Sequence, residues 1–110
     1  MICIVYERKA HRLTADGHAG SGPEGHDLVC AGVSALLCTL ASAVRGLAES
    51  FDDEAEAPEI TLTSGYAVIA CRPSESCSAL TTLIFDCFCG GFALLAKRHP
   101  ENISYLQEEG

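Results

Sequence analysis

Apolar and polar residues alternate through two short stretches near the start of the chain. Residues 2–8 are rich in isoleucine, valine and tyrosine, and residues 11–18 place Leu13 and Ala15 on one face with polar side chains on the other. A period of two residues combined with β-branched side chains is typical of half-buried strands. Because only a two-residue polar connection separates the stretches, we predict that they form a β-hairpin.

Two longer segments, 28–50 and 78–98, change to the period of a helix. Apolar residues occur nearly all round the first helix and recur near helical spacing in the second. Gly90 and Gly91 weaken the middle of the second helix and allow a bend or close packing there. A helix that is apolar on several faces is usually buried on several sides. In so small a domain, this pattern points to a second subunit that covers the first helix.

A second hairpin is predicted from two short apolar stretches, 60–64 and 66–72, that turn near Gly65. The predicted order of elements is therefore strand, strand, helix, strand, strand, helix. Residues 103–106 form a short terminal piece that is expected to dock against the core. A length of 110 residues suits one compact domain, so we predict a single domain over 1–110.

The charge of the chain limits its partners. The formal net charge is −8, which argues against nucleic acid as a direct ligand because phosphate binding needs clustered lysine and arginine. An acidic chain suits a basic peptide substrate, and equally it serves solubility alone. Residues 51–59 carry five carboxylates without a lysine or arginine. This run is expected to be a solvated linker, with a substrate-attracting acidic lip as the alternative.

Cysteine usage indicates a reducing compartment. The chain has seven cysteines, an odd number, and its start lacks the pattern of a signal peptide. We therefore expect reduced thiols in the cytoplasm rather than a disulfide framework. We find no uninterrupted stretch long and apolar enough for a convincing membrane span, so no membrane partner is expected.

The residues most suggestive of chemistry lie between the first hairpin and the first helix. His18 stands at the end of the predicted second strand, and Asp27 is a good N-cap for the helix. Cys30 then falls in the first helical turn, where the positive end of the helix dipole favours a thiolate. An imidazole brought close by the intervening turn can act as its base, so Cys30 and His18 are predicted to form a nucleophile and base pair. Asp27 offsets part of the same field and is also a candidate for orienting a histidine or polarising water.

Other interpretations of these residues stay open. A cysteine in an apolar helix is often only a small hydrophobe, which is the plainer interpretation of Cys30. His26 competes for the role of base, but His18 is favoured because a strand end anchors it. Ser34 lies one turn after Cys30. Its hydroxyl either contacts the thiolate or a substrate carbonyl, or bonds back to the backbone carbonyl of Cys30.

The remaining glycines suggest a lid, and the remaining cysteines raise the question of a metal site. Gly20, Gly22 and Gly25 fit neither the dinucleotide nor the phosphate-loop fingerprint, so we predict a flexible lid over a substrate. A redox or zinc-binding domain is a further alternative, but the thiols lack paired C-x-x-C knuckles, so no metal or cofactor is expected. The thiols concerned are Cys71, Cys77, Cys87 and Cys89. Cys3, Cys38 and Cys71 are most simply core fillers.

The run from Gly17 to Ser34 resembles the signature of the ribosomal-processing cysteine proteases called Prp. That signature has a Gly-His-Ala start, a flexible loop, then Gly-x-Asp-Ile-Val-Cys-Ala and a serine four positions after the cysteine. This chain has Gly17-His18-Ala19, Gly25-His26-Asp27-Leu28-Val29-Cys30-Ala31 and Ser34. Leu28 replaces the commoner isoleucine, and Ser21-Gly22-Pro23 replaces the usual aromatic or alanine-containing loop. Chain length and element order also fit the family.

The resemblance implies an α+β fold, expected here as two layers with a four-stranded antiparallel sheet and two helices (β-β-α-β-β-α), assembled as a homodimer. It implies that Cys30 is the nucleophile, that His18 is the base, and that Asp27 and Ser34 support them. The implied substrate is the precursor of a large-subunit ribosomal protein, from which a short N-terminal extension is removed. The alternative is a non-catalytic ribosomal-protein-binding or ribosome-assembly module that holds the same peptide without cutting it.

Overall fold

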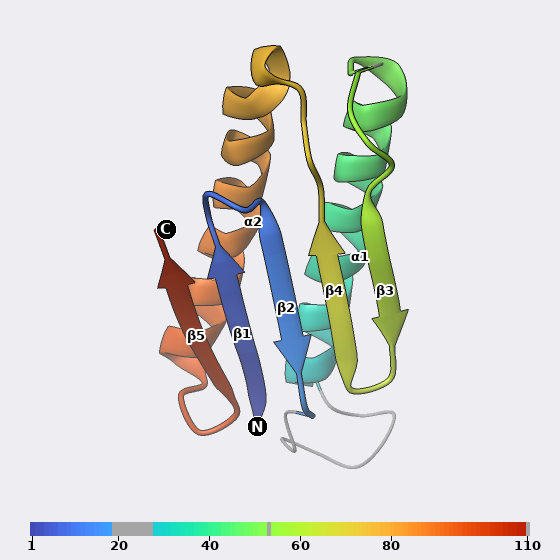
Figure 1. The fold of residues 1–110 in the computed structure, drawn as a ribbon. Helices are drawn as coiled ribbons and strands as arrows, with labels where there is room; N and C mark the ends of the chain where they lie inside the picture. The colour runs from blue at the N-terminus through green and yellow to red at the C-terminus, as the bar shows by residue number, and fades with distance from the viewer. Residues whose placement is uncertain (19–27, 53, 110) are drawn as a thin grey trace.

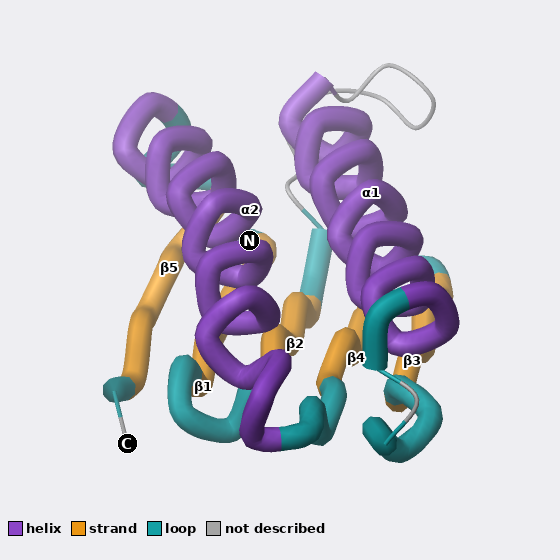
Figure 2. The backbone as a smooth tube through the Cα atoms, turned by 90° about the horizontal axis from the view of Figure 1, so that it is seen from above, coloured by secondary structure: helices purple, strands orange, loops and turns teal. Residues whose placement is uncertain are grey.

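Two helices cover one face of a β-sheet, and the other face of the sheet has no helix over it in the described part of the chain (Figures 1 and 2). The structure is a computed structural model that describes residues 1–18, 28–52 and 54–109. The helices are α1 (Leu28–Ser50) and α2 (Ser78–Arg98), the latter preceded by the short 3-10 turn η1 (Glu75–Cys77). The strands are β1 (Ile2–Glu7), β2 (Arg12–Asp16), β3 (Glu59–Thr63), β4 (Tyr66–Ala70) and β5 (Ile103–Glu108).

The sheet has five strands in the order β3-β4-β2-β1-β5. The four predicted strands are antiparallel to their neighbours as expected, but the prediction was wrong in strand number, and the fifth strand makes the sheet mixed. Both predicted hairpins are present, but β5 pairs parallel to β1, from Ile2 opposite Ile103 to Glu7 opposite Glu108. The first hairpin satisfies only one edge of β1, and β5 supplies hydrogen-bond partners along the other edge. The piece expected only to dock is therefore an edge strand of the sheet.

The two predicted helices are confirmed, and each buries one face against the sheet. The buried face of α1 is formed by Val29, Val33, Leu37, Leu40, Ala41, Val44 and Leu47, and that of α2 by Thr81, Phe85, Cys89 and Phe92. The prediction that Cys3 and Cys38 fill the core was wrong, since both are exposed, whereas Cys71 is buried as expected. Cys38 falls outside the buried face of α1, because the 3.6-residue period of a helix returns to the sheet at Leu37 and Ala41.

A polar network holds α2 on β1. The hydroxyl of Tyr6, which is fully buried, donates to Asp86 Oδ1 at 2.8 Å, and Arg8 Nη2 donates to Asp86 Oδ2 at 2.9 Å. The Arg8 guanidinium, followed by the Tyr6 hydroxyl, keeps the pKa of the Asp86 carboxyl below its ordinary value. The Tyr6 ring also stacks on Phe85 of the same helix, with centroids 5.8 Å apart. Helix and strand are thus fixed by both apolar and charge-assisted contacts.

Both helices reach the length and hydropathy of a membrane span, with a mean hydropathy of 1.8 in each. The expectation that no stretch would pass this test was therefore wrong on composition. Core helices of globular proteins pass the same test, and these two pack on the sheet through their buried faces. The outer face of α2 keeps three exposed leucines, Leu80, Leu83 and Leu94.

Candidate functional site

A pocket of about 240 Å³ lies at the end of the sheet where β2 ends and α1 begins. His18, Cys30 and Ser34 all line this pocket, although 12 and 16 positions separate His18 from the other two. The turn between β3 and β4 closes one side of it, near the lower end of the sheet in Figure 1. The structure therefore brings together three of the residues that the motif singled out. The Cys30 pocket is the name used for it below.

The position of Cys30 follows from where α1 starts. The helix begins at Leu28, so Cys30 is its third residue and lies in the first turn, as predicted. Backbone N–H groups in a first turn have no partner within the helix, and they provide positive potential next to the thiol. The Cys30 side chain is half-buried and packs on the hydrophobic core. A thiol in this position can be held rigidly and still face a substrate.

The position of His18 depends on two glycines. Gly17 has φ +105°, and a Cβ on it would lie 2.1 Å from the carbonyl oxygen of Met1. Its N–H donates to the carbonyl of Gly65 in the β3–β4 turn at 2.8 Å. Gly65 has φ +78°, and a Cβ there would lie 2.7 Å from His18 Nε2. The imidazole therefore rests against a turn that only glycine fits without displacement.

Sequence reasoning missed this role of Gly65. It identified a turn near that position but gave no reason for the turn to approach His18. The only sign of this role in the sequence is a glycine at a hairpin turn. Such a glycine is usually explained by the positive φ that the turn requires, without any contact to a site residue. Ser64 and Tyr66 of the same turn also line the Cys30 pocket and were not among the predicted site residues. Which of the proposed contacts Ser34 makes stays a prediction.

Several predicted site residues lie outside the described part of the chain. These are Asp27, proposed as N-cap and supporting group, and the lid glycines Gly20, Gly22 and Gly25. His26, the rival base, lies outside it as well. The structure therefore describes the surroundings of His18 but not those of His26.

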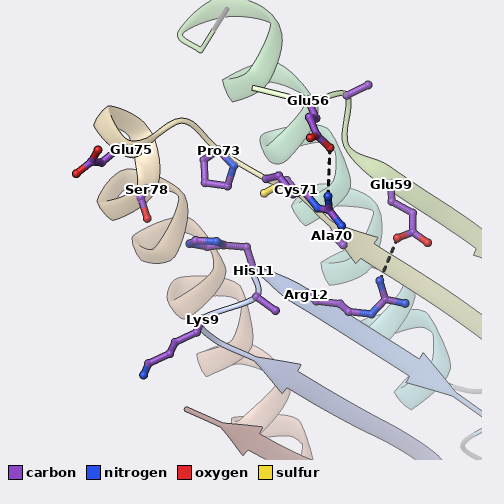
Figure 3. Close-up of a pocket in the computed structure, with 13 residues that line it drawn as sticks. Lys9, His11, Arg12, Glu56, Glu59, Ala70, Cys71, Pro73, Glu75 and Ser78 are labelled. Atoms are coloured by element: carbon purple, nitrogen blue, oxygen red, sulfur yellow. Dashed lines mark hydrogen bonds and ion pairs between the residues drawn. The ribbon is translucent and has the colours of Figure 1, made fainter. Parts of the chain in front are cut away.

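A larger cavity of about 850 Å³ lies at the opposite end of the sheet, where β2 begins, β4 ends and α2 starts (Figure 3). It also contains a thiol and an imidazole, from Cys71 and His11. Burial raises the pKa of the Cys71 thiol to about 11, so the thiolate is scarce at neutral pH. The His11 ring is engaged by Thr82 Oγ1, 2.8 Å from Nε2. This second thiol and imidazole pair is therefore a poor candidate for nucleophilic chemistry.

Four charged groups of the larger cavity form two ion pairs. Arg12 Nη1 lies 3.0 Å from Glu59 Oε2, and Arg72 Nη1 lies 3.6 Å from Glu56 Oε2 (Figure 3). Both glutamates belong to the acidic run 51–59, which therefore lines this cavity and not the Cys30 pocket. The alternative of a substrate-attracting acidic lip stays a prediction. The run is also not fully solvated, because Asp52 is buried and accepts the N–H of Ser74 at 2.9 Å.

The seven cysteines, all within the described residues, carry thiols and form no disulfide. Cys87 is exposed and Cys89 is buried, as expected for two positions on different faces of one helix. Among the described residues, no three histidine, cysteine, aspartate or glutamate side chains gather as a metal site would require.

Comparison with known proteins points to one family. A family model described as Cysteine protease Prp matches residues 1–104. The ribosomal processing cysteine protease Prp of Staphylococcus aureus (strain Mu50) is 30% identical over 102 residues, covering 93% of this chain and 91% of the relative. The crystal structure of the S. aureus protease with a covalently linked product peptide superposes with a TM-score of 0.74 at 25% identity, covering 97% of each chain. Its complex with a substrate peptide superposes with a TM-score of 0.67, also at 25% identity and 97% coverage of each.

Proposed function

This chain belongs to the Prp family of ribosomal-processing cysteine proteases, and from that membership we propose that it removes the N-terminal extension of a large-subunit ribosomal protein precursor. In this proposal Cys30 is the nucleophile and His18 is the general base. The observation that carries it is the Cys30 pocket, which His18, Cys30 and Ser34 line together. The chain is a cysteine protease by its family, and this pocket offers the thiol, the imidazole and a space for the peptide.

The proposed reaction has two halves. His18 takes the proton of Cys30, and the thiolate attacks the carbonyl carbon of the scissile peptide bond. N–H groups at the start of α1 stabilise the oxyanion, and His18 returns the proton to the leaving amine. Water then hydrolyses the thioester, with His18 acting again as base. Ser34 is proposed to orient the substrate carbonyl or the thiolate from one helical turn away.

The proposed partner is the N-terminal peptide of the ribosomal protein precursor, because the S. aureus relative has been seen with substrate and product peptides bound. We place the reaction in the cytoplasm, where seven cysteines remain as thiols. We also propose that the protein works as a homodimer. The exposed leucines on the outer face of α2, Leu80, Leu83 and Leu94, support this, since the described chain leaves them uncovered.

Cleavage of the extended precursor tests the proposal. The purified protein is mixed with the precursor and the product is followed by mass spectrometry. Cys30→Ala is expected to lower the rate by at least about 10⁴-fold, and His18→Ala by about 10²- to 10⁴-fold. The matched control is Cys38→Ala, which removes an exposed thiol two turns further along α1 and is expected to keep wild-type activity.

The non-catalytic alternative gives a different result in the same experiment. A binding module would leave the precursor intact and retain it equally well in the wild type and in Cys30→Ala. A protease releases the extension in the wild type, and only the Cys30→Ala variant holds the uncut precursor. Cleavage that survives in both active-site variants would contradict the assigned roles of Cys30 and His18.

A further inference from the structure

The face of the sheet that lies opposite the two helices carries an uncharged row of side chains between two rows that hold acidic groups (Figure 2). Side chains alternate between the two faces of a strand, so the strand register assigns three rows of residues to this face. The middle row is Thr61, Val68, Thr14, Val5 and Leu106. The outer rows are Glu59, Ala70, Arg12, Glu7 and Glu108, and Thr63, Tyr66, Asp16, Cys3 and Ser104. We call these three rows the open face.

The middle row of the open face is more apolar than a sheet face turned to water requires. Val68 is 3% exposed and Leu106 is 55% exposed, and Val5 is half-buried. The other two members are threonines, so the row has no charge. The solvated face of an antiparallel sheet normally carries polar side chains. This row therefore offers apolar contact to a partner.

Carboxylates lie on both sides of the middle row. Glu59, Glu7 and Glu108 belong to one outer row, and Asp16 belongs to the other. Arg12 is the one cation in the three rows, and it already lies 3.0 Å from a carboxylate oxygen of Glu59 and 4.0 Å from one of Glu7. Glu7 and Glu108 are direct neighbours on paired strands, and like charges in that arrangement destabilise a sheet. A basic partner relieves this repulsion.

The open face is continuous with the Cys30 pocket. Thr63 and Tyr66 belong to an outer row of the face and also line the pocket. Five strands about 4.8 Å apart span about 19 Å, which an extended chain covers in about six residues. A substrate that enters the Cys30 pocket can therefore contact the open face at the same time.

We propose that the open face docks the basic mature part of the ribosomal protein precursor while the Cys30 pocket cleaves the extension. This proposal rests on the function proposed above. A mature ribosomal protein carries clustered lysine and arginine because it binds the phosphates of RNA. These cations pair with the carboxylates of the outer rows, and their apolar stems cover the middle row.

The charge of the chain favours this occupant over others. The net charge of −8 attracts a basic protein. A second copy of this chain presents the same acidic rows, so its open face is repelled by this one. An anionic lipid surface is disfavoured for the same reason.

Binding of the mature ribosomal protein, which lacks the extension, tests docking separately from cleavage. Isothermal titration at low ionic strength is expected to show binding to the wild type. The double variant Glu7→Lys/Glu108→Lys is expected to weaken this binding by at least about tenfold. The matched control is Glu49→Lys/Glu54→Lys, which changes the net charge equally at exposed positions in and just after the last turn of α1. The control is expected to lose much less affinity.

An uncharged substitution tests the middle row. Leu106→Gln is expected to weaken binding of the mature protein, because it removes an exposed leucine without changing any charge. The matched control is Phe51→Gln, which removes an apolar side chain that is 76% exposed at the end of α1 and is expected to bind as the wild type does.

Cleavage kinetics connect docking to the proposed reaction. The KM for the full precursor is expected to be lower than the KM for a short peptide that contains only the extension and the cleavage site. Glu7→Lys/Glu108→Lys is expected to raise the KM for the precursor and to leave the KM for the peptide unchanged. A peptide that is not cleaved contradicts the proposed function, and the titration still decides the docking.

Three results would overturn the docking proposal. The first is a mature protein that does not bind, even if the short peptide is cleaved. The second is an equal loss of affinity in the two double variants, which would assign binding to net charge alone. The third is a KM for the full precursor that equals the KM for the peptide.

Discussion

At the scale of single residues, the Cys30 pocket depends on backbone positions more than on extra catalytic groups. Gly17 and Gly65 both have positive φ angles, and the N–H of Gly17 donates to the carbonyl of Gly65. Each glycine lets two segments approach where a Cβ would collide. His18 is the residue after Gly17, and its imidazole lies against Gly65. Its position is therefore set by glycines that carry no chemistry themselves.

Gly65→Ala is expected to damage catalysis more than stability. The added Cβ would lie 2.7 Å from His18 Nε2, so the ring must move, and the positive φ adds strain of about 1 kcal/mol. We expect kcat to fall by at least about tenfold with little change in KM. Peptide cleavage kinetics and thermal unfolding measure the two effects. Gly46→Ala is the control, because its Cβ meets open space in α1, and it is expected to keep activity and gain stability.

His11 gives the protein a predictable response to acid. It is buried with φ +49°, and burial lowers the pKa of its imidazole below the ordinary value of 6.5. Because the unfolded chain then binds the proton more readily, stability is complete above pH 6.5 and falls as the pH drops through that value. The loss for one proton is at most about 1.4 kcal/mol per pH unit.

His11→Asn is expected to flatten this response, since asparagine tolerates a positive φ and does not titrate. Urea unfolding at pH 7.5 and pH 5.5 provides the measurement. The wild type should lose more stability than His11→Asn between the two values. Equal losses in both proteins would assign the response to another group.

At the scale of elements, β5 is the part of the fold that local pattern did not reveal. The two hairpins follow from alternating apolar and polar residues around a turn. The two helices follow from the helical spacing of apolar residues over long segments. Both kinds of element could therefore be predicted from neighbouring residues. Residues 103–108 are short and half polar, and their parallel pairing with β1 is a contact across about a hundred positions. Parallel strands are not joined by a short turn, so no local sequence pattern predicts their pairing.

Ile103→Ala tests how much β5 contributes. The Ile103 side chain is 1% exposed and belongs to the core cluster, so its truncation is expected to cost about 2–5 kcal/mol of unfolding free energy. Leu106→Ala on the same strand removes a leucine that is 55% exposed and should change stability by about 0.5 kcal/mol or less. Denaturant unfolding of both variants gives the comparison. Similar small effects would show that β5 adds little to stability.

At the scale of the whole molecule, two thiol and imidazole pairs occupy opposite ends of one sheet. The motif from Gly17 to Ser34 predicted that His18 and Cys30 lie near each other, because only a short segment joins the strand end to the helix start, and both residues line the Cys30 pocket. The larger cavity with Cys71 and His11 could not be predicted, since it forms from three segments far apart in the chain. Its buried thiol and paired charges distinguish it chemically from the Cys30 pocket.

The relative reactivity of the seven thiols tests the central claim most directly. Cys3, Cys38 and Cys87 are exposed and Cys30 is half-buried, so accessibility alone favours the other three. Substoichiometric iodoacetamide at pH 7, followed by peptide mass spectrometry, is predicted to label Cys30 first, and His18→Ala is predicted to slow that labelling by at least about tenfold. Labelling of the three exposed thiols ahead of Cys30, or a Cys30 rate unchanged in His18→Ala, would contradict the account.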